Sequence, residues 1–562
     1  MTMPQVFVEI AFRADTGNGS WLWRDVSTDV EWWSGVTIAR RRSHELDEVQ
    51  PGTLALTLTN TDGRYTAGNA LSIHYPNVRI NRQIRVRARW PVSPNMLLER
   101  QAQASDVSLF GAEIGTIAAD AVIVPPGQTS SIRWDTGGAA AGVRLLVGPA
   151  GIATATSWGI PVVEGAGYAL SCQVRSSGSG SASVNVRIRW YDGTGTFLSG
   201  PAGTAVALSG TWQQATVTGT APAGAVWARL ILVPTTVVPA GLLIHSGAWQ
   251  FEQAVSATAW ASPGVEYMRY VGYVDRWPHQ WANGVLGQVA ITATDRQKLF
   301  GRQILGSAAL TLPDNQPSGG RAQTLLTLAG VTNWSLDSGL SRLGLSGNEA
   351  TQNVQQLLRS TAASEAGLFF MDRSGVPVFQ DRGRRQRPSA AVLTVTADQV
   401  GPDLSFVVDD ALLINDATVL LDDGTAGTPQ TNPASIGAYG TYSKRMDTLL
   451  QTTAEADDRA RYLLGKYAEP QPRASQISIE AHSQPDLFDE LLASEIGQRI
   501  QVTSLPSNAP TGTLDLWVEG VQDTITDQSW TFTLDPSPAA VTISFILDDS
   551  TYGALDSNRL GW

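Results

Sequence analysis

The feature that most constrains the fold is a succession of three strand-like segments that occurs twice. Each copy has an Arg/Gln-Ile-x-Val segment, then an apolar stretch around a glycine, then a closing segment with strand-like alternation. The first copy is NRQIRVRARW (81–90), RYVGYVDRW (269–277) and GQVAITATD (287–295), and the second is IGQRIQVTSLP (496–506), LWVEGVQDTI (516–525) and SWTFTLDPSP (529–538). The order of segments is the same in both, which indicates an internal duplication.

The spacing of the segments supports a duplication interrupted by an insertion. Val86 and Gly272 lie 186 positions apart, and residues 94–264 account for 171 of these, which leaves 15. The matching residues of the second copy, Val502 and Gly520, lie 18 positions apart. We therefore predict two similar β-barrels, with residues 94–264 inserted into a loop of the first, because loop tips tolerate insertions. Chance similarity of short β segments is the alternative.

Residues 94–264 are expected to form a separate β-sandwich or jelly roll. Their composition shifts to small and β-branched residues, and SVNVRIRWYDGTGTFL (183–198) alternates apolar and polar residues before an Asp-Gly turn. Aromatic side chains on such a sandwich can hold sugar rings, although tryptophan also packs in cores. Trp190 shares the spacing of Val184 and is expected in the core. The glycan-facing candidates are Trp134, Trp158 and Tyr191, and the sparse charge of the unit favours neutral sugars.

Two regions depart from strand spacing and predict helices within a mainly β protein that has a smaller α+β part. Residues 321–370 carry Val354, Leu357 and Leu358 at helical spacing, and residues 448–466 form an amphipathic pattern. The predicted domains are residues 1–93 and 265–305 (first barrel), 94–264 (inserted jelly roll), 306–390 (an α+β domain with helices), 391–538 (second barrel, with a helix over 448–466) and 539–562 (C-terminal extension).

The composition argues against several classes of protein. The net charge of -12 over 562 residues disfavours a nucleic-acid or anionic-membrane partner. Cys172 is the only cysteine, so neither a disulfide within the chain nor a cysteine-based zinc site is expected. No apolar run approaches the roughly 20 residues of a membrane-spanning helix. The N-terminus lacks the pattern of a signal peptide, so we expect synthesis and folding in a cytoplasm.

No motif predicts a catalytic residue, a cofactor site or a metal site. Asp-Thr-Gly occurs at Asp15 and at Asp135, but the two triplets fall in different predicted domains, so the shared proton of an aspartic protease is implausible and turn chemistry explains both. The sequence has no His-Glu-x-x-His and no Gly-x-Ser-x-Gly, and it does not exclude a Ser-His-Asp set formed by the fold. The acidic stretches 420–427 and 547–556 predict solvated turns, with a weak calcium site as the alternative.

Several stretches outside residues 94–264 together resemble a known family. They are DVSTDVEWW (25–33), VTIARRRSHELDEVQPGTLALTLTNTDGRYTAGNALSIHYPNVRINRQIRVRARW (36–90), EAGLFFMDRSGVPVFQDR (365–382), LINDATVL (413–420), YGTYSKRMDTLLQTTAEADDRARYLLGKYAEPQPR (439–473) and STYGALDSNRLGW (550–562). They resemble minor tail proteins of long-tailed actinobacterial phages, within the tailed-phage tail-hub (baseplate hub) family. Within residues 94–264, NMLL (95–98), GYALSCQVR (167–175), WYDGTG (190–195), TWQQATVTGTAPAGA (211–225) and ATAW (257–260) follow one another in an order that resembles the jelly roll of carbohydrate-binding modules. The corner at Asn60–Tyr65 is then expected to be structural, with Asp62 capping its own turn and Gly63 at positive φ.

The resemblance implies a structural, non-enzymatic virion protein at the tail tip, assembled in the host cytoplasm. Hub subunits of this kind carry two similar barrels and form homotrimers, whose six barrels can dock on a six-fold tail tube. The partners it implies are the distal tail protein or the end of the tail tube, the tape measure protein and other tail-tip or fibre proteins. The insert would bind host cell-wall glycan or another tail protein.

Two alternative functions belong to other classes of protein. A glycan-degrading enzyme with an attached sugar-binding module would need paired carboxylates in an aromatic cleft, for which Asp422 and Asp423 are candidates in turn-like segments. A lectin-like adhesin would need neither the duplicated barrels nor the helical region.

Overall fold

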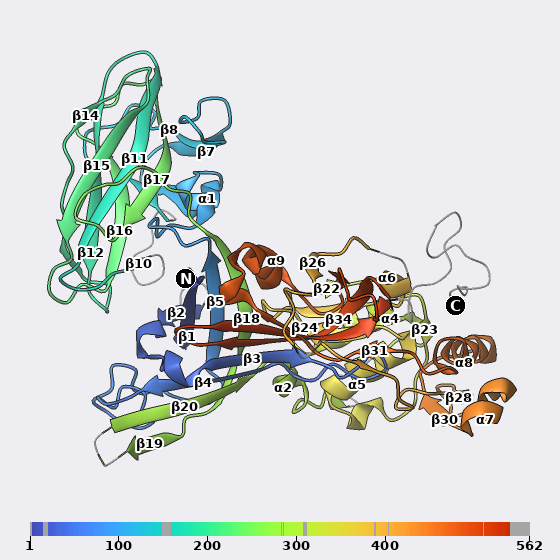
Figure 1. Cartoon of the computed structure of the whole chain (residues 1–562). Coiled ribbons are helices and arrows are strands. Elements are labelled where there is room, and N and C mark those ends of the chain that lie inside the picture. Colours follow the sequence, from blue (N-terminus) through green and yellow to red (C-terminus); the bar gives the residue numbers. More distant parts are fainter. Residues whose placement is uncertain are drawn as a thin grey trace.

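The protein is mainly β, with a smaller helical part. The computed structural model describes residues 3–14, 21–148, 159–282, 284, 286–306, 312–386, 389–402, 404–509 and 511–539 (Figure 1). In this part of the chain, no helix has the length and apolar character needed to span a membrane. The predicted C-terminal extension lies outside the described residues apart from Ala539.

One 13-stranded sheet forms the body of the protein. Its strands are β1 (Gln5–Ala14), β2 (Trp21–Asp25), β3 (Val36–Arg41), β4 (Thr53–Thr59), β5 (Gln83–Trp90), β18 (Val265–Arg276), β19 (His279–Ala282), β20 (Leu286–Thr294), β26 (Leu393–Thr396), β32 (Ile477–Glu480), β33 (Arg499–Thr503), β34 (Leu514–Ile525) and β35 (Trp530–Pro538). All pairings in this sheet are antiparallel except that of β26 with β33.

A four-stranded unit occurs twice in this sheet, with the same strand order. The first unit runs β4-β20-β18-β5 across the sheet, and the second runs β32-β35-β34-β33. When the strands of each unit are numbered in chain order, both units read first, fourth, third, second across the sheet. The third strand of each unit also carries a register shift, at Met268/Tyr270 in β18 and at Val518/Gly520 in β34. The repeat of strand order agrees with the duplication read from the sequence.

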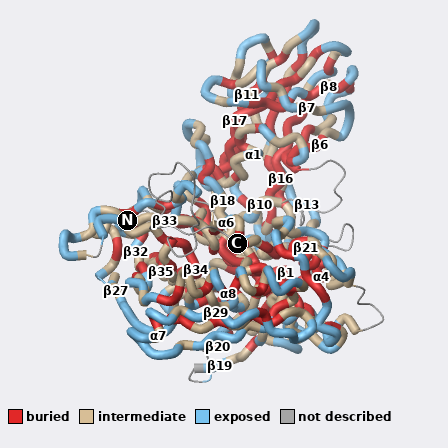
Figure 2. Tube along the Cα trace, turned by 90° about the vertical axis from the view of Figure 1, so that its right-hand side faces the viewer, coloured by how far each residue is buried: buried red, intermediate tan, exposed pale blue. Residues whose placement is uncertain are grey.

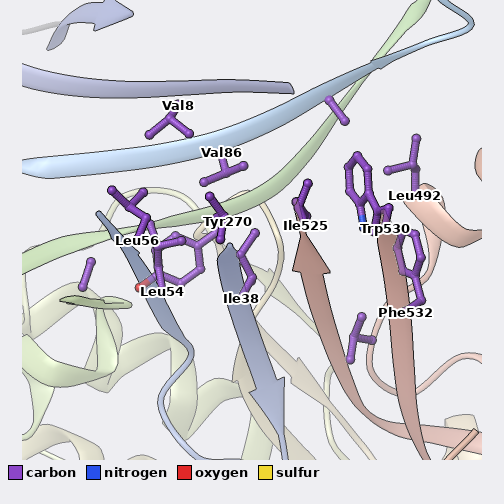
Figure 3. Close-up of a cluster of buried hydrophobic side chains, with 14 of the residues drawn as sticks. Val8, Ile38, Leu54, Leu56, Val86, Tyr270, Leu492, Ile525, Trp530 and Phe532 are labelled. Carbon is purple, nitrogen blue, oxygen red and sulfur yellow. The ribbon is translucent and has the colours of Figure 1, made fainter. Parts of the chain in front are cut away.

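The two units share one sheet and one core. β3 pairs with β4 of the first unit and with the C-terminal half of β34, from Val36 opposite Ile525 to Arg41 opposite Gly520. Figure 3 shows side chains of both units in a single cluster of buried hydrophobic residues, among them Val86 and Tyr270 from the first and Trp530 from the second. The relative position of the two units is thus fixed by backbone pairing as well as by packing.

The corner after β4 is a structural turn. Asn60 is buried, and its Oδ1 accepts a hydrogen bond from Tyr65 N at 2.8 Å. Asp62 Oδ1 accepts from Arg64 N at 3.0 Å, and Gly63 has a φ of 72°. Tyr65 is buried, and its hydroxyl donates to Asp29 Oδ2. The roles predicted for Asp62 and Gly63 are confirmed.

The segment between β5 and β18 folds into a β-sandwich with its own core (Figure 2). The seven-stranded sheet contains β6 (Phe110–Ala112), β9 (Leu145–Val147), β10 (Ile160–Pro161), β12 (Ser183–Tyr191), β13 (Phe197–Ser199), β14 (Val206–Ala207) and β16 (Trp227–Pro234). The five-stranded sheet contains β7 (Thr116–Asp120), β8 (Ser131–Asp135), β11 (Gly167–Gly178), β15 (Gln213–Thr220) and β17 (Leu242–Glu252). A short helix, α1 (Glu99–Ala102), precedes them. Trp190 and Trp249 lie in the core between the sheets, as predicted for Trp190.

Two smaller groups of elements contain most of the helices. The first has α2 (Gln297–Phe300), β21 (Gln316–Pro317), α4 (Ser318–Leu328), β22 (Ser335–Leu336), β23 (Arg342–Leu343), α5 (Val354–Glu365), β24 (Leu368–Met371), β25 (Pro377–Gln380) and α6 (Gly383–Gln386). The second has β27 (Phe406–Val407), β28 (Asp416–Leu420), β29 (Gln430–Thr431), α7 (Pro433–Tyr439), β30 (Ser443–Asp447), α8 (Thr453–Tyr467), β31 (Arg473–Ala474) and α9 (Phe488–Ala493). Val354, Leu357 and Leu358 are buried along α5, as their helical spacing indicates.

The helix predicted over residues 448–466 begins later than expected. Residues 443–447 form β30, which pairs in parallel with β28, and α8 starts at Thr453. Thr452 is the N-cap, and its hydroxyl accepts a hydrogen bond from Glu455 N at 3.3 Å. Leu449 and Leu450 have the apolar character that extended the predicted helix, but they belong to the connection after a strand.

Candidate functional site

The sandwich is attached to the tip of a hairpin in the main sheet. Trp90 at the end of β5 is directly opposite Val265 at the start of β18, so the strands on either side of the insert are already paired (Figure 1). Figure 1 shows the sandwich standing beyond the end of these two strands, apart from most of the main sheet. This is the geometry of an insertion at a loop tip.

Asn95 joins the first and last residues of the sandwich. Its side chain is fully buried, and Nδ2 donates to Trp249 O at 3.0 Å and to Ala261 O at 3.2 Å. Its Oδ1 accepts from Leu97 N and from Phe251 N. A single amide therefore uses both its donor and its acceptor groups to hold together the segment that enters the sandwich and the segment that leaves it.

The segment that returns from β17 to β18 is fixed by a second polar network. Gln250 is fully buried, and its Oε1 accepts from Ala261 N at 2.7 Å. Glu252 Oε1 accepts from Thr258 N, and its Oε2 accepts from the Thr258 hydroxyl. Together with Asn95, these bonds fix the insert at both chain connections.

The three predicted glycan-facing aromatics have different outcomes. Trp134 has no exposed surface, and its Nε1 donates to Ile114 O at 2.8 Å inside the sandwich. The prediction for Trp134 is therefore wrong, because the side chain packs in the core with Ile132 of the same strand. Trp158 lies outside the described residues. Tyr191 is half-buried at the end of β12 and points away from the core, because its neighbour Trp190 points into it.

Tyr191 belongs to a group of arginine and aromatic side chains on the outer surface of the seven-stranded sheet. On β12 and β16, alternate residues fill the core, and the residues between them face outward. We call the arginine and aromatic members of this outward group, together with Phe197 of β13, the arginine–aromatic face: Arg187, Arg189, Tyr191, Phe197, Trp227 and Arg229. Trp227 and Arg229 are buried, and Phe197 is the most exposed member. The Arg189 guanidinium carbon lies 4.3 Å from the centroid of the Phe197 ring and 5.8 Å from that of Tyr191. The Tyr191 and Phe197 rings meet edge to face, with centroids 5.6 Å apart.

One end of this face lies beside the main body. The guanidinium carbon of Arg24 on β2 is 5.5 Å from the centroid of the Trp227 ring. Burial lowers the pKa of Arg229; the positive charges of Arg189 and Arg144 act in the same direction, and Tyr191 and Glu113 oppose them. The face therefore gathers like charges that a sequence window does not bring together.

Of the members of this face, only Tyr191 was predicted from the sequence as a ligand-facing residue. The alternation of Arg187, Arg189 and Tyr191 with the apolar residues of SVNVRIRWY was a usable signal for the β12 members. Phe197 and Arg229 gave no comparable signal, because they join the face through pairing of β12 with β13 and β16.

A Ser-His-Asp contact does occur on the other sheet of the sandwich. Ser177 Oγ lies 2.8 Å from His245 Nε2, while His245 Nδ1 lies 3.7 Å from Asp120 Oδ2. The second distance is too long for a hydrogen bond. Asp120 Oδ1 accepts the backbone N–H groups of Val122 and Ile123, and the His245 side chain is fully buried. Burial lowers the pKa of His245. This arrangement ties the loop after β7 to the sheet and does not orient the imidazole as a catalytic triad does.

The carboxylates considered for a glycan-degrading enzyme do not form a pair in an aromatic cleft. Asp422 lines a cavity of about 340 Å³ together with Glu349 and Asp447, and none of the described lining residues is aromatic. Asp423 is exposed and is not among the lining residues; its Oδ1 accepts from Thr425 N at 2.8 Å within the turn. The stretch 420–427 thus contains a solvated turn, as predicted.

The remaining motifs add no metal or catalytic site. Asp135 Oδ1 accepts from Gly137 N at 2.9 Å, and Gly137 has a φ of 65°, so this Asp-Thr-Gly is a turn. The triplet at Asp15 and the acidic stretch 547–556 lie outside the described residues. Within the described ranges, no group of three or more His, Cys, Asp or Glu residues is placed to hold a metal ion.

Comparison with known proteins finds similarity in structure. No protein-family model matches the chain, and no curated protein matches it. Among solved structures, the chain is similar to the 43 kDa tail protein of prophage MuSo2 from Shewanella oneidensis, with 12% identity over 66% of this chain and 99% of that chain, at a TM-score of 0.34. It is also similar to the tail protein from Neisseria meningitidis MC58, with 14% identity over 50% of this chain and 82% of that chain, at a TM-score of 0.36.

The chain is also similar to solved structures of sugar-binding modules. The chain is similar to the CBM22-1 xylan-binding domain of Paenibacillus barcinonensis Xyn10C, with 17% identity over 26% of this chain and 87% of that chain, at a TM-score of 0.20. The structural neighbours are thus prophage tail proteins and xylan-binding domains. At these identities and TM-scores, the similarity carries no inference about what this chain binds or assembles with.

Proposed function

We propose that the protein is a structural, non-enzymatic component of a phage virion, a homotrimeric hub at the tail tip. In this role it joins the end of the tail tube to the host-recognition apparatus. The observation that carries the proposal is the four-stranded unit that occurs twice in one sheet. Three chains would supply six similar units, which is the number needed to match a six-fold tube, and closed symmetry requires such matching surfaces. The sequence resemblance to tail-hub proteins supports the same reading.

A connector of this kind has to keep its two units at a fixed angle, and the contacts between them suit that requirement. Arg269 on β18 is fully buried and pairs with Asp523 on β34 through two bonds of 2.9 Å. Arg269 Nη1 also donates to Leu492 O at 2.6 Å. These bonds add to the β3–β34 pairing, so the angle between the units does not depend on a flexible linker.

The partners proposed for the hub follow from its place in the tail. They are the distal tail protein or tail-tube end, the tape measure protein and other tail-tip or fibre proteins. The inserted sandwich is proposed to bind glycan on the host cell surface, with contact to another tail protein as the second candidate. The position of the sandwich at a hairpin tip favours a binding role, because it can meet a partner without altering the main sheet (Figure 1).

Native mass spectrometry of the purified full-length chain tests the assembly. We expect a species of three times 59.9 kDa. A chain from which residues 94–264 are replaced by a short Gly-Ser bridge is the matched control, and it should also form trimers. A dimer or tetramer as the predominant species would contradict the proposal, as would absence of the protein from purified tail tips probed with an antibody.

A further inference from the structure

The arginine–aromatic face contains a pair of like charges that strand pairing forces together. Arg189 on β12 is directly opposite Arg229 on β16 in an antiparallel ladder. Like charges in directly opposite positions destabilise a sheet. Arg187 lies two positions before Arg189 on the same side of β12. The fold therefore concentrates positive charge on one side of a sandwich whose overall charge is sparse.

Carboxylates within the described structure do not form ion pairs with the half-buried Arg187 and Arg189. Arg187 donates to Asn185 Oδ1 at 3.0 Å, and the described residues provide no ion pair for Arg187 or Arg189. Arg189 Nε is buried and has no hydrogen-bond partner among them. The two nearby carboxylates have other partners: Glu113 pairs with Arg144, and Asp192 accepts the N–H groups of Thr194 and Thr196 in its own turn.

The aromatic members hold the Arg189 guanidinium in place. Phe197 is 47% exposed and lies 4.3 Å from the guanidinium carbon, with Tyr191 on the same arginine at 5.8 Å. Stacking of this kind fixes the guanidinium plane and leaves its N–H edge for a planar anion. The face thus offers a fork of donors for an anionic group next to a surface on which a sugar ring can stack.

We propose that the arginine–aromatic face binds an acidic glycan, with Arg189 holding an anionic group and Phe197 stacking on an adjacent ring. This inference rests on the proposed glycan-binding role of the sandwich and names its ligand class. An acidic glycan replaces the neutral sugars that the sparse charge of the sequence predicted. The composition counts the charges of both sheets together, whereas the pairing of β12 with β16 places three arginines on one sheet. Uronate carboxylates and phosphodiesters share the chemistry that this face recognises.

Binding of the full-length chain to immobilised polymers tests the inference. The probes are polygalacturonate, poly(glycerol phosphate) and neutral galactan, each measured at low and at high salt. We expect binding to one or both anionic polymers, weakened by salt, and no comparable binding to galactan. Binding to polygalacturonate alone would assign a carboxylate as the ligand, and binding to poly(glycerol phosphate) alone would assign a phosphate.

Three variants locate the binding site. Arg189→Gln should lower affinity for the anionic polymer by about tenfold or more, because a charge-assisted hydrogen bond is lost. Phe197→Ala should lower it by a similar factor, because the ring on which the sugar stacks is removed. Arg100→Gln is the matched control, because Arg100 is exposed on the same sandwich, pairs with Asp106 and should leave binding unchanged. Far-ultraviolet circular dichroism of each variant separates lost binding from lost folding, and the exposed Phe197 keeps the test valid if Arg189→Gln misfolds.

The negative outcomes separate this inference from the function it rests on. Equal binding of wild type, Arg189→Gln and Phe197→Ala to the anionic polymers would overturn the site. Tight binding to galactan alone would overturn the acidic ligand but keep the glycan role. Binding to none of the polymers by a protein that still forms trimers would remove the glycan role together with this site, and leave the hub.

Discussion

Replacing Glu519 with glutamine tests whether one buried carboxylate holds three parts of the protein together. Glu519 lies on β34, has no exposed surface, and accepts hydrogen bonds from Arg42 Nε at 2.7 Å and Arg385 Nη1 at 2.6 Å. The Ser537 hydroxyl also donates to it. Arg42 follows β3, and Arg385 belongs to α6, so the carboxylate links the end of the strand that joins the two units, the helical region and the second unit.

The magnitude follows from the charges around this carboxylate. Burial alone would raise the pKa of Glu519, but the charges and hydrogen bonds of Arg385 and Arg42 outweigh burial and hold the pKa at about 2. Because the folded-state pKa lies below the ordinary value of 4.5, the carboxylate stabilises the fold above that pH by roughly 3 kcal/mol. This contribution is lost as pH falls from the ordinary value towards 2. Glutamine would leave Arg42 and Arg385 buried without a counter-charge, which costs about 3–5 kcal/mol.

Denaturant unfolding followed by tryptophan fluorescence measures the effect. At neutral pH, Glu519→Gln should unfold at a clearly lower denaturant concentration, by an amount equivalent to about 3–5 kcal/mol. Glu480→Gln, at an exposed position on β32, is the matched control and should stay within about 0.5 kcal/mol of wild type. A Glu519→Gln protein as stable as the Glu480→Gln control would refute the reasoning. So would a Glu519→Gln protein whose free energy of unfolding falls as steeply as that of wild type between pH 4.5 and about 2.

Three further predictions concern the insert and a second buried carboxylate. Replacing residues 94–264 by a Gly-Ser bridge should leave the main sheet folded by circular dichroism, because Trp90 and Val265 are already paired, and the excised segment should unfold cooperatively on its own. Asn95→Ala should destabilise the sandwich by about 2–4 kcal/mol and speed proteolysis between β17 and β18, because it leaves buried backbone groups unpaired. Burial raises the pKa of Asp295 from its ordinary value of 3.8 to about 6. The free energy of unfolding should therefore fall by about 3 kcal/mol as pH rises from 3.8 through about 6, because ionisation of the buried carboxyl destabilises the fold. Asp295→Asn should remove this dependence of stability on pH.

The occurrence of two similar units could be predicted because a duplicated strand order leaves a trace in the sequence. Segments that pair as neighbours in one copy recur with nearly the same spacing in the other, once the insert is removed. The junction between the units left no such trace. β3 pairs with β34 across 479 positions from Arg41 to Gly520, and nothing local to either strand indicates its partner. The start of α8 was also misjudged, because apolar spacing in Leu449 and Leu450 continues through a segment that is not helical.

The binding face shows the limit of periodicity more sharply. Alternation separates two sides of a strand but does not say which side is the core. The core position of Trp190 was predicted correctly because Val184, Val186 and Ile188 lie on the same side of β12. Strand β8 is short, and Ile132 is the only other large apolar residue on the side of Trp134, so its pattern did not identify the core side. The opposition of Arg189 and Arg229 depends on the register of two strands 40 positions apart, which only the fold supplies.

The attachment of the sandwich bears directly on how the two proposed roles can coexist in one chain. A single shallow face binds a polymer weakly, and three copies on a trimer would strengthen binding through effective concentration, provided that all three faces reach the same surface. A flexible tether would allow each sandwich many orientations. Here the paired ends of β5 and β18 bring both chain connections to one place on the hub, and the amide of Asn95 holds the entering and leaving segments of the insert together. The same arrangement keeps the insert out of the β3–β34 junction. Excision of the insert should therefore abolish attachment to cell walls and preserve trimers, while Glu519→Gln should weaken the body and leave the intrinsic affinity of the face unchanged.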